Sequence, residues 1–212
     1  MGFVVKEIFY TLQGEGFHTG RPVVFCRFSG CNLWSGREVD REIAKCRFCD
    51  TDFLGIAKSG GRFDNAKVLA HVIRSFFPDY QHPGYLPYVV FTGGEPALQI
   101  TTELLQELKW HGVESGIETN GTLALPDGLD WVTVSPKAGT ELVVTSGNEL
   151  KLVWPQEGIS LQELEGLDFE YFYLQPLDCR DGSKAIQQAV RACLKHPVWK
   201  LSLQTHKFIG IP

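Results

Sequence analysis

The stretch that decides the fold is Tyr88–Thr119, with the sequence YVVFTGGEPALQITTELLQELKWHGVESGIET. It begins with a β-branched and aromatic run, Tyr88–Phe91, which predicts a buried strand. A glycine-rich turn follows, then a helical pattern near Leu98–Trp110 and a second strand near Gly116–Thr119. Because a helix separates the two strands, they are expected to pair in parallel through a helical crossover.

The same patterns recur on both sides of this stretch. Further strands are expected near Val4–Phe9, Val23–Phe28, Trp131–Val134, Leu150–Trp154, Tyr171–Leu174 and Leu201–Leu203. Helices are expected near Asn65–Phe77 and Ser183–Leu194, and a short one from Ser160, which has Glu163 in the capping-box position. The apolar stripes expected to face the core are Val68, Val72, Ile73 and Phe76; Leu98, Leu104, Leu105 and Leu108; and Ile186, Val190 and Leu194.

Two connections contain Pro or several Gly and do not suit full crossover helices: Asn120–Asp130 and Pro136–Glu149. The chain has 212 residues, fewer than the roughly 250 of a complete eight-unit barrel. We therefore expect an α/β fold, a truncated, partial (β/α) TIM-type barrel with about six core parallel strands and few crossover helices. No repeat or flexible linker divides the sequence, so residues 1–212 are expected to form a single domain.

Composition narrows the functional classes. Twenty Lys and Arg against 25 Asp and Glu give a net charge of −5, which argues against a broad nucleic-acid footprint. No apolar run approaches the roughly 18 residues of a membrane span, and the N-terminus lacks a signal-peptide pattern. We expect a cytoplasmic protein without a nucleic-acid or membrane partner, and one large enough to fold without disulfides or metals.

Polar groups follow the carboxyl ends of the expected strands. In a parallel barrel all these ends open onto one face, so their side chains should converge on a single cleft. The groups are Thr92-Gly93-Gly94-Glu95-Pro96, Glu118-Thr119-Asn120-Gly121, Ser135-Pro136-Lys137, Gln175-Pro176-Leu177-Asp178 and Gln204-Thr205-His206-Lys207.

Four of the six cysteines lie within 24 residues: Cys26, Cys31, Cys46 and Cys49. Cys46-Arg47-Phe48-Cys49 is a CxxC motif, which suits zinc, thioredoxin-like redox chemistry or an iron–sulfur cluster. With Cys31 it supplies three thiolates. A structural zinc would need His18 or Cys26 as its fourth ligand, whereas a [4Fe–4S] cluster would keep one iron open to a cofactor. Spacing alone does not choose between them.

In combination these motifs resemble a known superfamily. A three-cysteine loop followed by TGGEP, ETNG and SPK is similar to the radical S-adenosylmethionine enzymes. Within them, Tyr10–Gly16, Arg27–Leu33 and Cys49–Thr51 resemble the 7-carboxy-7-deazaguanine synthases of the 7-deazapurine and queuosine pathway, and the resemblance extends from Tyr10 to Pro212.

The cysteine spacing departs from the usual CxxxCxxC of the superfamily. Here 14 residues, Asn32–Lys45, separate the first two cysteines. Their alternating charges, with Val39 and Ile43 four apart, predict a short solvated helix. The insertion lengthens the cluster-binding loop at 31–49 without removing a ligand.

The resemblance implies a radical lyase that converts 6-carboxy-5,6,7,8-tetrahydropterin to 7-carboxy-7-deazaguanine with release of ammonia. Cys31, Cys46 and Cys49 would hold a [4Fe–4S] cluster, and Thr51 would bind Mg²⁺, with Asp50 and Asp52 beside it. S-adenosylmethionine would be held at the strand ends by Thr92, Gly93, Gly94, Glu95, Ser135, Lys137, Gln175 and Asp178.

Substrate contacts are implied by the same resemblance. They would come from Leu12, Gln13, Gly14, Glu15, Arg27, Thr92, His206 and Pro212. Glu15 would accept hydrogen bonds from a guanidine-like edge and Arg27 would pair with a carboxylate, unless the two form an ion pair with each other. Glu15, Arg27 and Thr51 would be the catalytic residues. The apolar tail, Phe208, Ile209 and Ile211, is expected to be buried so that the carboxylate of Pro212 reaches the substrate.

Two rival hypotheses stay open at this point. One is an activating protein for a glycyl-radical enzyme, from the same superfamily. The other is a binding module stabilised by zinc. The partners implied by the favoured hypothesis are the small-molecule pterin and a one-electron reductant of the flavodoxin or ferredoxin type. A homodimer is also expected, in part because of the aromatic segment Phe169–Tyr173.

Overall fold

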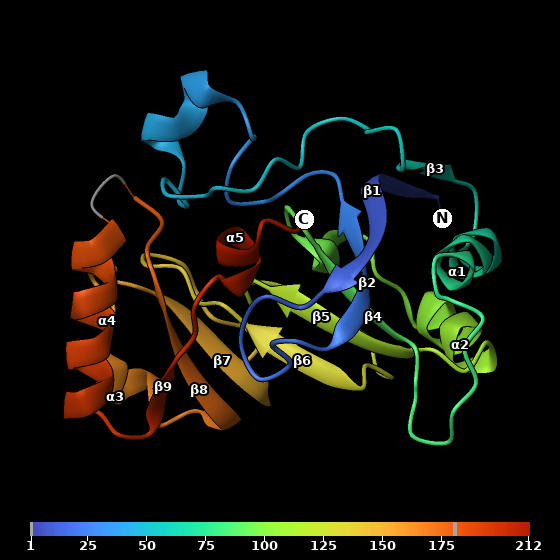
Figure 1. The fold of residues 1–212 in the computed structure, drawn as a ribbon. Helices are drawn as coiled ribbons and strands as arrows, with labels where there is room; N and C mark the ends of the chain where they lie inside the picture. Colours follow the sequence, from blue (N-terminus) through green and yellow to red (C-terminus); the bar gives the residue numbers. More distant parts are fainter. Residues whose placement is uncertain (1, 180–181) are drawn as a thin grey trace.

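The computed structural model describes residues 2–179 and 182–212 (Figure 1). The strands are β1 (Phe3–Leu12), β2 (Pro22–Phe28), β3 (Gly61–Phe63), β4 (Tyr88–Gly93), β5 (Glu114–Thr119), β6 (Trp131–Val134), β7 (Ser146–Trp154), β8 (Asp168–Pro176) and β9 (Trp199–Leu201). The α-helices are α1 (Ala66–Ser75), α2 (Thr102–Trp110), α3 (Leu161–Leu164), α4 (Gly182–Lys195) and α5 (Thr205–Ile209), and two 3₁₀ helices are η1 (Glu38–Ile43) and η2 (Pro96–Leu98).

The strands form one open sheet in the order β3-β1-β2-β4-β5-β6-β7-β8-β9. From β2 to β9 every neighbouring pair is parallel. β1 pairs antiparallel with β2, and β3 pairs antiparallel with β1. The curved sheet does not close on itself, so the predicted partial barrel is confirmed, with one parallel strand more than expected.

Helices cover the outer face of this sheet in two groups. α1 packs beside α2 against one half, and α3 and α4 lie against the other (Figure 1). Alternate residues of the strands serve the two faces: on β7, Leu150 and Leu152 pack outward, whereas Glu149 and Lys151 face the inside of the barrel. The barrel interior therefore carries charged groups that the outer layer does not.

The helix ends follow the sequence pattern, but two of the predicted apolar stripes were wrong. Asn65 and Ser160 cap α1 and α3 through their side chains, as capping residues should. In α4 the buried residues are Ala185 and Ala189, because small side chains allow the helix to approach the sheet closely; the longer Val190 and Leu194 are exposed, and Ile186 is half-buried.

α1 and α2 show smaller versions of the same error. In α1, Ile73 of the expected stripe is buried and Val72 and Phe76 pack against the core; Val68 is exposed, and Ala66, Leu69 and Ala70 complete the buried face. Leu98 precedes α2 and is exposed. The last strand is also displaced: β9 ends at Leu201, and the residues after it turn into α5.

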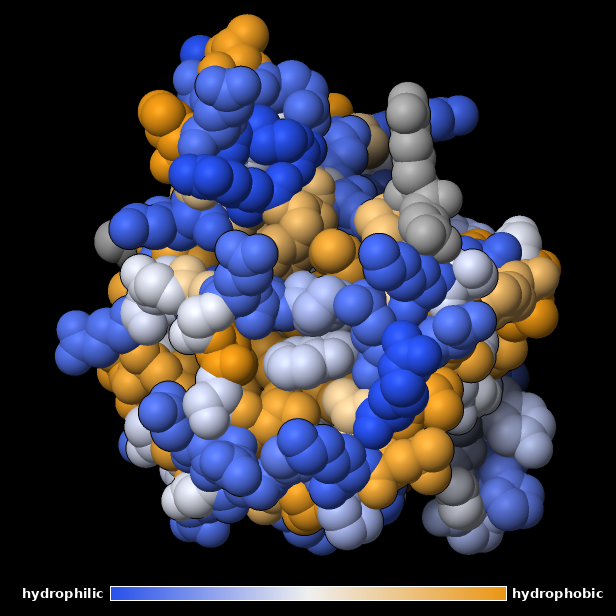
Figure 2. All heavy atoms as spheres, turned by 90° about the vertical axis from the view of Figure 1, so that its left-hand side faces the viewer, coloured by the Kyte–Doolittle hydropathy of each residue, from blue (hydrophilic) through white to orange (hydrophobic). Residues whose placement is uncertain are grey.

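The two helix-poor connections are confirmed: residues 120–130 and 135–145 contain no helix. The insertion at Asn32–Lys45 forms the 3₁₀ helix η1, with Val39 and Ile43 exposed. Seen from the side of α4, this segment stands above the molecule and is mostly hydrophilic, with hydrophobic side chains at its tip (Figure 2). In the part of the chain that the structure describes, no helix combines the length and apolar character needed to cross a bilayer.

Candidate active site

A cavity of about 420 Å³ opens at the carboxyl ends of the parallel strands. All five of the polar strand-end groups predicted from the sequence contribute to its lining, together with residues 12–15 after β1, the cysteine loop and the chain terminus. The predicted convergence on one cleft is confirmed. Such a position is where α/β barrels place their functional groups, since the loops there can vary without disturbing the sheet.

The cysteine loop forms one wall of the cavity. Cys31, Cys46 and Cys49 all line it. The long insertion does not separate them, because the backbone N–H of Lys45 donates to the carbonyl of Leu33 (3.0 Å) and closes the inserted lobe at its base. Underneath, Trp34, Ala44 and Phe53 form a small buried cluster against which Cys31 and Cys49 pack.

The three thiols have unequal proton affinities. Cys46 and Cys49 lie within hydrogen-bonding reach, and this bond lowers the pKa of Cys49 to about 6 while raising that of Cys46. Burial raises the pKa of Cys31. Soft sulfur donors grouped at a cavity wall suit an iron–sulfur cluster, whose remaining position would face the cavity.

The zinc alternative is wrong, because neither proposed fourth ligand reaches the loop. Cys26 is fully buried in the outer core with Phe28 and Phe91. His18 stacks with Phe17, Tyr88 and Trp131 on the inner side of the sheet.

The Gly93-Gly94 turn joins this loop to the strand ends. A Cβ atom at Gly94 would lie 2.0 Å from the carbonyl oxygen of Gly30 and 2.9 Å from the Cβ of Cys31. Gly93 has φ +128°, and a Cβ there would lie 2.2 Å from the carbonyl oxygen of Phe28. A side chain at either position would collide with the backbone of Phe28 or Gly30, so the packing of the chain itself requires both glycines. A ligand can occupy only the space on the cavity side of the turn.

Glu95 lies under this turn and not in the cavity wall. It is fully buried, and its carboxylate accepts hydrogen bonds from the N–H of Ala97 (2.9 Å), the hydroxyl of Thr119 (2.7 Å) and the N–H of Asn120 (2.8 Å). Burial raises its pKa, although these hydrogen bonds oppose the rise. The expected direct contact of Glu95 with a cofactor is corrected: it joins the end of β4 to the end of β5.

The remaining predicted cofactor residues line the cavity beside the cysteines. Lys137 is held by the carbonyl and hydroxyl of Ser135 (2.6 and 2.8 Å), and burial lowers its pKa. Gln175 is buried at the end of β8. Asp178 is exposed and forms an ion pair with Lys207, which also binds Asp50 at 3.0 Å. Thr92 and Thr51 line the same cavity.

The predicted substrate residues also line this cavity, and together they are called the substrate wall. Leu12, Gln13, Gly14 and Glu15 reach it from the β1–β2 connection. Arg27 donates to Glu7 (2.8 Å), and Glu15 pairs with Lys151 (2.7 Å), so the alternative of an Arg27–Glu15 ion pair is wrong. Asp52 forms an ion pair with Lys6 at 2.9 Å. It is therefore not a free carboxylate next to Thr51, the predicted Mg²⁺ ligand.

The C-terminal segment completes this wall. α5 is anchored by Thr205, whose N–H and hydroxyl both donate to the carbonyl of Gly14 (2.9 and 2.8 Å). His206 consequently packs so close to Gly14 that a Cβ atom there would lie 2.2 Å from its Nδ1. Pro212 lines the cavity, but Phe208 and Ile209 are exposed, which corrects the expected burial of the tail.

Two charged residues on the cavity floor were given no role by the sequence, although Glu118 was expected to reach the cleft with its strand-end group. Glu118 lies next to the last residue of β5 and Lys151 lies on β7, and both line the cavity. The signal for Lys151 was present in the sequence: in Glu149-Leu150-Lys151-Leu152, charged and apolar residues alternate, as they do when a strand has a polar inner face.

Comparisons with known proteins agree with this geometry. A 7-carboxy-7-deazaguanine synthase from Nitratidesulfovibrio vulgaris is 58% identical over 219 residues, covering 100% of both chains. One from Bradyrhizobium diazoefficiens is 54% identical over 212 residues, again with 100% coverage of both. A crystal structure of QueE from Escherichia coli superimposes with a TM-score of 0.70 at 28% identity, covering 97% of this chain and 95% of that one. No family model matches the chain.

Proposed function

The chain belongs to the 7-carboxy-7-deazaguanine synthase family of radical S-adenosylmethionine lyases, and on this premise we propose that it converts 6-carboxy-5,6,7,8-tetrahydropterin to 7-carboxy-7-deazaguanine with release of ammonia. The observation that carries the proposal is that the three cysteines and the polar segment Leu12–Glu15 line the same cavity. The direct test is anaerobic incubation of the cluster-loaded, reduced protein with S-adenosylmethionine and this pterin.

The cysteine wall suits the cofactors. Cys31, Cys46 and Cys49 would hold a [4Fe–4S] cluster, and Gly94, Ser135, Lys137, Gln175 and Asp178 would hold S-adenosylmethionine against it. When bound, these two groups supply one-electron chemistry and a radical that abstracts hydrogen from the substrate. Lys137 places a buried ammonium near the cysteines, where it favours negative charge.

The substrate wall suits both the ring and the carboxylate of the pterin. The carboxylate of Glu15 can accept hydrogen bonds from the guanidine-like edge of the ring, and Arg27 can pair with the substrate carboxylate. Leu12 and Gly14 present backbone groups, whereas Gln13, Thr92 and His206 present polar side chains. The protein's part is thus to hold the ring between the cofactor wall and the floor, with its reacting atom oriented.

We also propose that the protein receives its electron from a flavodoxin or ferredoxin and forms a homodimer. The segment Phe169–Tyr173, expected to be exposed, does not support the second of these, because Phe169, Phe172 and Tyr173 are buried. Other exposed apolar side chains, on one edge of the molecule, do support it. They belong to α4, β9 and the turn between them: Val190, Leu194, Val198 and Leu201.

Thr51 is proposed as a ligand of Mg²⁺. It lines the same cavity as the cysteines and the substrate wall, and its hydroxyl is an oxygen donor of the kind that Mg²⁺ prefers. Replacing Thr51 by Ala is expected to lower turnover at limiting Mg²⁺ by about tenfold or more, and Thr51→Ser to restore it. The measurement is the initial rate as a function of Mg²⁺ concentration. A Thr51→Ala variant with the wild-type dependence would show that Mg²⁺, if used, binds elsewhere.

Pro212 is proposed to bring its carboxylate to the substrate. The carbonyl end of Pro212 accepts a hydrogen bond from the Thr11 hydroxyl at 3.3 Å, beside the cavity. A short Gly-Ser extension of the C-terminus is expected to lower kcat/KM by about ten- to hundredfold, the usual value of one hydrogen bond to a charged group. The same extension on the N-terminus is the control. Wild-type kinetics with the C-terminal extension would remove Pro212 from the site.

A further inference from the structure

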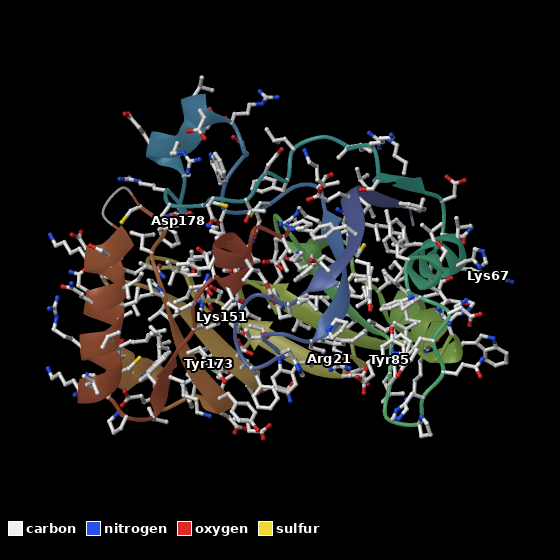
Figure 3. All side chains as sticks on the ribbon, in the orientation of Figure 1. Arg21, Lys67, Tyr85, Lys151, Tyr173 and Asp178 are labelled. Atoms are coloured by element: carbon white, nitrogen blue, oxygen red, sulfur yellow. The ribbon has the colours of Figure 1, made fainter. Side chains whose placement is uncertain are left out.

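Lys151 is a buried cation at the centre of the cavity floor. It is 5% exposed and its side chain reaches from β7 to Glu15 of the β1–β2 connection, whereas Lys67 points outward from α1 (Figure 3). Its ammonium donates to Glu15 at 2.7 Å and to Glu118 at 3.2 Å. Lys151 thus connects a residue of the proposed substrate wall to a residue at the end of β5.

These contacts belong to a closed ring of hydrogen bonds. The Lys151 ammonium donates to the carboxylates of both Glu15 and Glu118. The backbone N–H of Glu15 donates to the side-chain oxygen of Gln13 (3.2 Å), and the amide nitrogen of Gln13 donates to Glu118 (3.0 Å), which closes the ring. The ring joins the β1–β2 connection, β5 and β7. A closed ring fixes each member from two sides, so that none of its side chains can rotate independently.

The ring matters because the segment that carries Gln13 and Glu15 has little regular structure of its own. Gln13–Gly20 form only turns between β1 and β2. Below the ring, the N–H of Phe17 donates to Glu149 at 3.1 Å and that of Gly16 to Ser202 at 2.9 Å. The orientation of Gln13 and Glu15 therefore depends on side chains of the strands beneath them.

The charges of the ring also favour binding of a guanidine-like group. Burial alone would lower the pKa of Lys151, but the carboxylates of Glu118, Glu15 and Glu149 outweigh burial and raise it, so the ammonium is retained. Glu149, with its pKa raised by burial to about 7, contributes only part of a charge. Glu15 and Glu118 with one ammonium leave one net negative charge at the floor, and Glu149 adds part of another; this negative charge complements the N–H donors of a guanidine-like edge.

We propose that Lys151 and Glu118 are positioning residues for the pterin: through the ring they fix the orientation of Glu15 and Gln13. The proposal rests on the proposed function. It predicts that breaking the ring harms substrate placement and leaves binding of S-adenosylmethionine unchanged, because none of the ring's hydrogen bonds involves a residue proposed to hold the cofactor.

The test compares Lys151→Met and Glu118→Gln with a matched control, Lys200→Met. Lys200 lies on β9 with its ammonium 5.1 Å from the ring centre of Tyr171, away from the cavity lining. For the two ring variants we expect the dissociation constant of the pterin, measured by anaerobic calorimetry on the cluster-loaded protein, to rise by roughly ten- to hundredfold. S-adenosylmethionine should bind within about twofold of wild type, since residues that share no partner contribute nearly independently.

Turnover gives an independent readout. A misplaced substrate should uncouple the reaction, so that more 5′-deoxyadenosine forms per molecule of deazaguanine in the ring variants than in wild type or Lys200→Met. The double variant should resemble Lys151→Met alone, because residues of one network are not additive. The isosteric Glu118→Gln keeps the test valid if Lys151→Met does not fold.

Unchanged pterin binding and coupling in Glu118→Gln would overturn the proposal, as would equal weakening of pterin and S-adenosylmethionine binding. Failure of the proposed function is a separate outcome, since wild type itself would then form no deazaguanine.

Discussion

Replacing Cys46 by Ala is expected to abolish both cluster binding and turnover. Cys46 is buried at the cavity wall and shares a hydrogen bond with Cys49. The loop at 31–49 contains no fourth cysteine that could replace it as a cluster ligand. Cys26, the cysteine nearest in sequence outside the set of three, is fully buried in the outer core and cannot take its place. Because the chemistry belongs to the bound cluster, activity should fall below detection rather than decline in part.

The measurement is the iron content and visible absorbance after anaerobic reconstitution. Cys193→Ala is the matched control, since Cys193 packs on α4 against the outer core and not in the cavity. Wild-type iron content in Cys46→Ala would contradict the assignment of this cysteine as a ligand. Loss of iron in Cys193→Ala would show that the assay reports folding and not ligation.

The second large effect is expected for Gly94→Ala. The added methyl group would lie 2.0 Å from the Gly30 carbonyl, which is backbone and cannot rotate away. The turn and the start of the cysteine loop must therefore separate, at a cost of about 1–3 kcal/mol in the free energy of unfolding. Because both the turn and Cys31 line the cofactor wall, we expect binding of S-adenosylmethionine to weaken by more than about a hundredfold.

Calorimetry with S-adenosylmethionine and the unfolding midpoint test this prediction together. Gly182→Ala is the control, because a Cβ at Gly182 meets no atom within 4 Å. It should bind the cofactor as wild type does. Wild-type affinity in Gly94→Ala would mean that the glycine is dispensable and that the cysteine loop is not fixed by this turn.

Much of the architecture could be predicted from local patterns. The run from Tyr88 to Thr119 indicates a strand, a helix and a parallel strand, and the structure has β4, α2 and β5 there. The convergence of the strand-end groups followed from the same parallel pairing. Residues of this kind are predictable because their positions depend on the backbone of one element and its neighbour.

The parts that the sequence did not predict depend on contacts between distant segments. The ring joins Gln13 and Glu15 to Glu118 and Lys151, more than 100 residues away in sequence. Glu95 resembled a cavity residue because it follows two glycines, but the backbone of the cysteine segment covers it. The contact face of α4 was mispredicted because close approach selected Ala185 and Ala189 over the larger apolar residues.

The most direct test of the account is the product formed by the cluster-loaded, reduced protein. With S-adenosylmethionine and 6-carboxy-5,6,7,8-tetrahydropterin under anaerobic conditions, mass spectrometry should detect 7-carboxy-7-deazaguanine, with ammonia released in equal amount. Absence of this product while iron content and S-adenosylmethionine binding are intact would contradict the account, and hydrogen abstraction from a glycine-loop peptide instead would favour the activating-enzyme alternative.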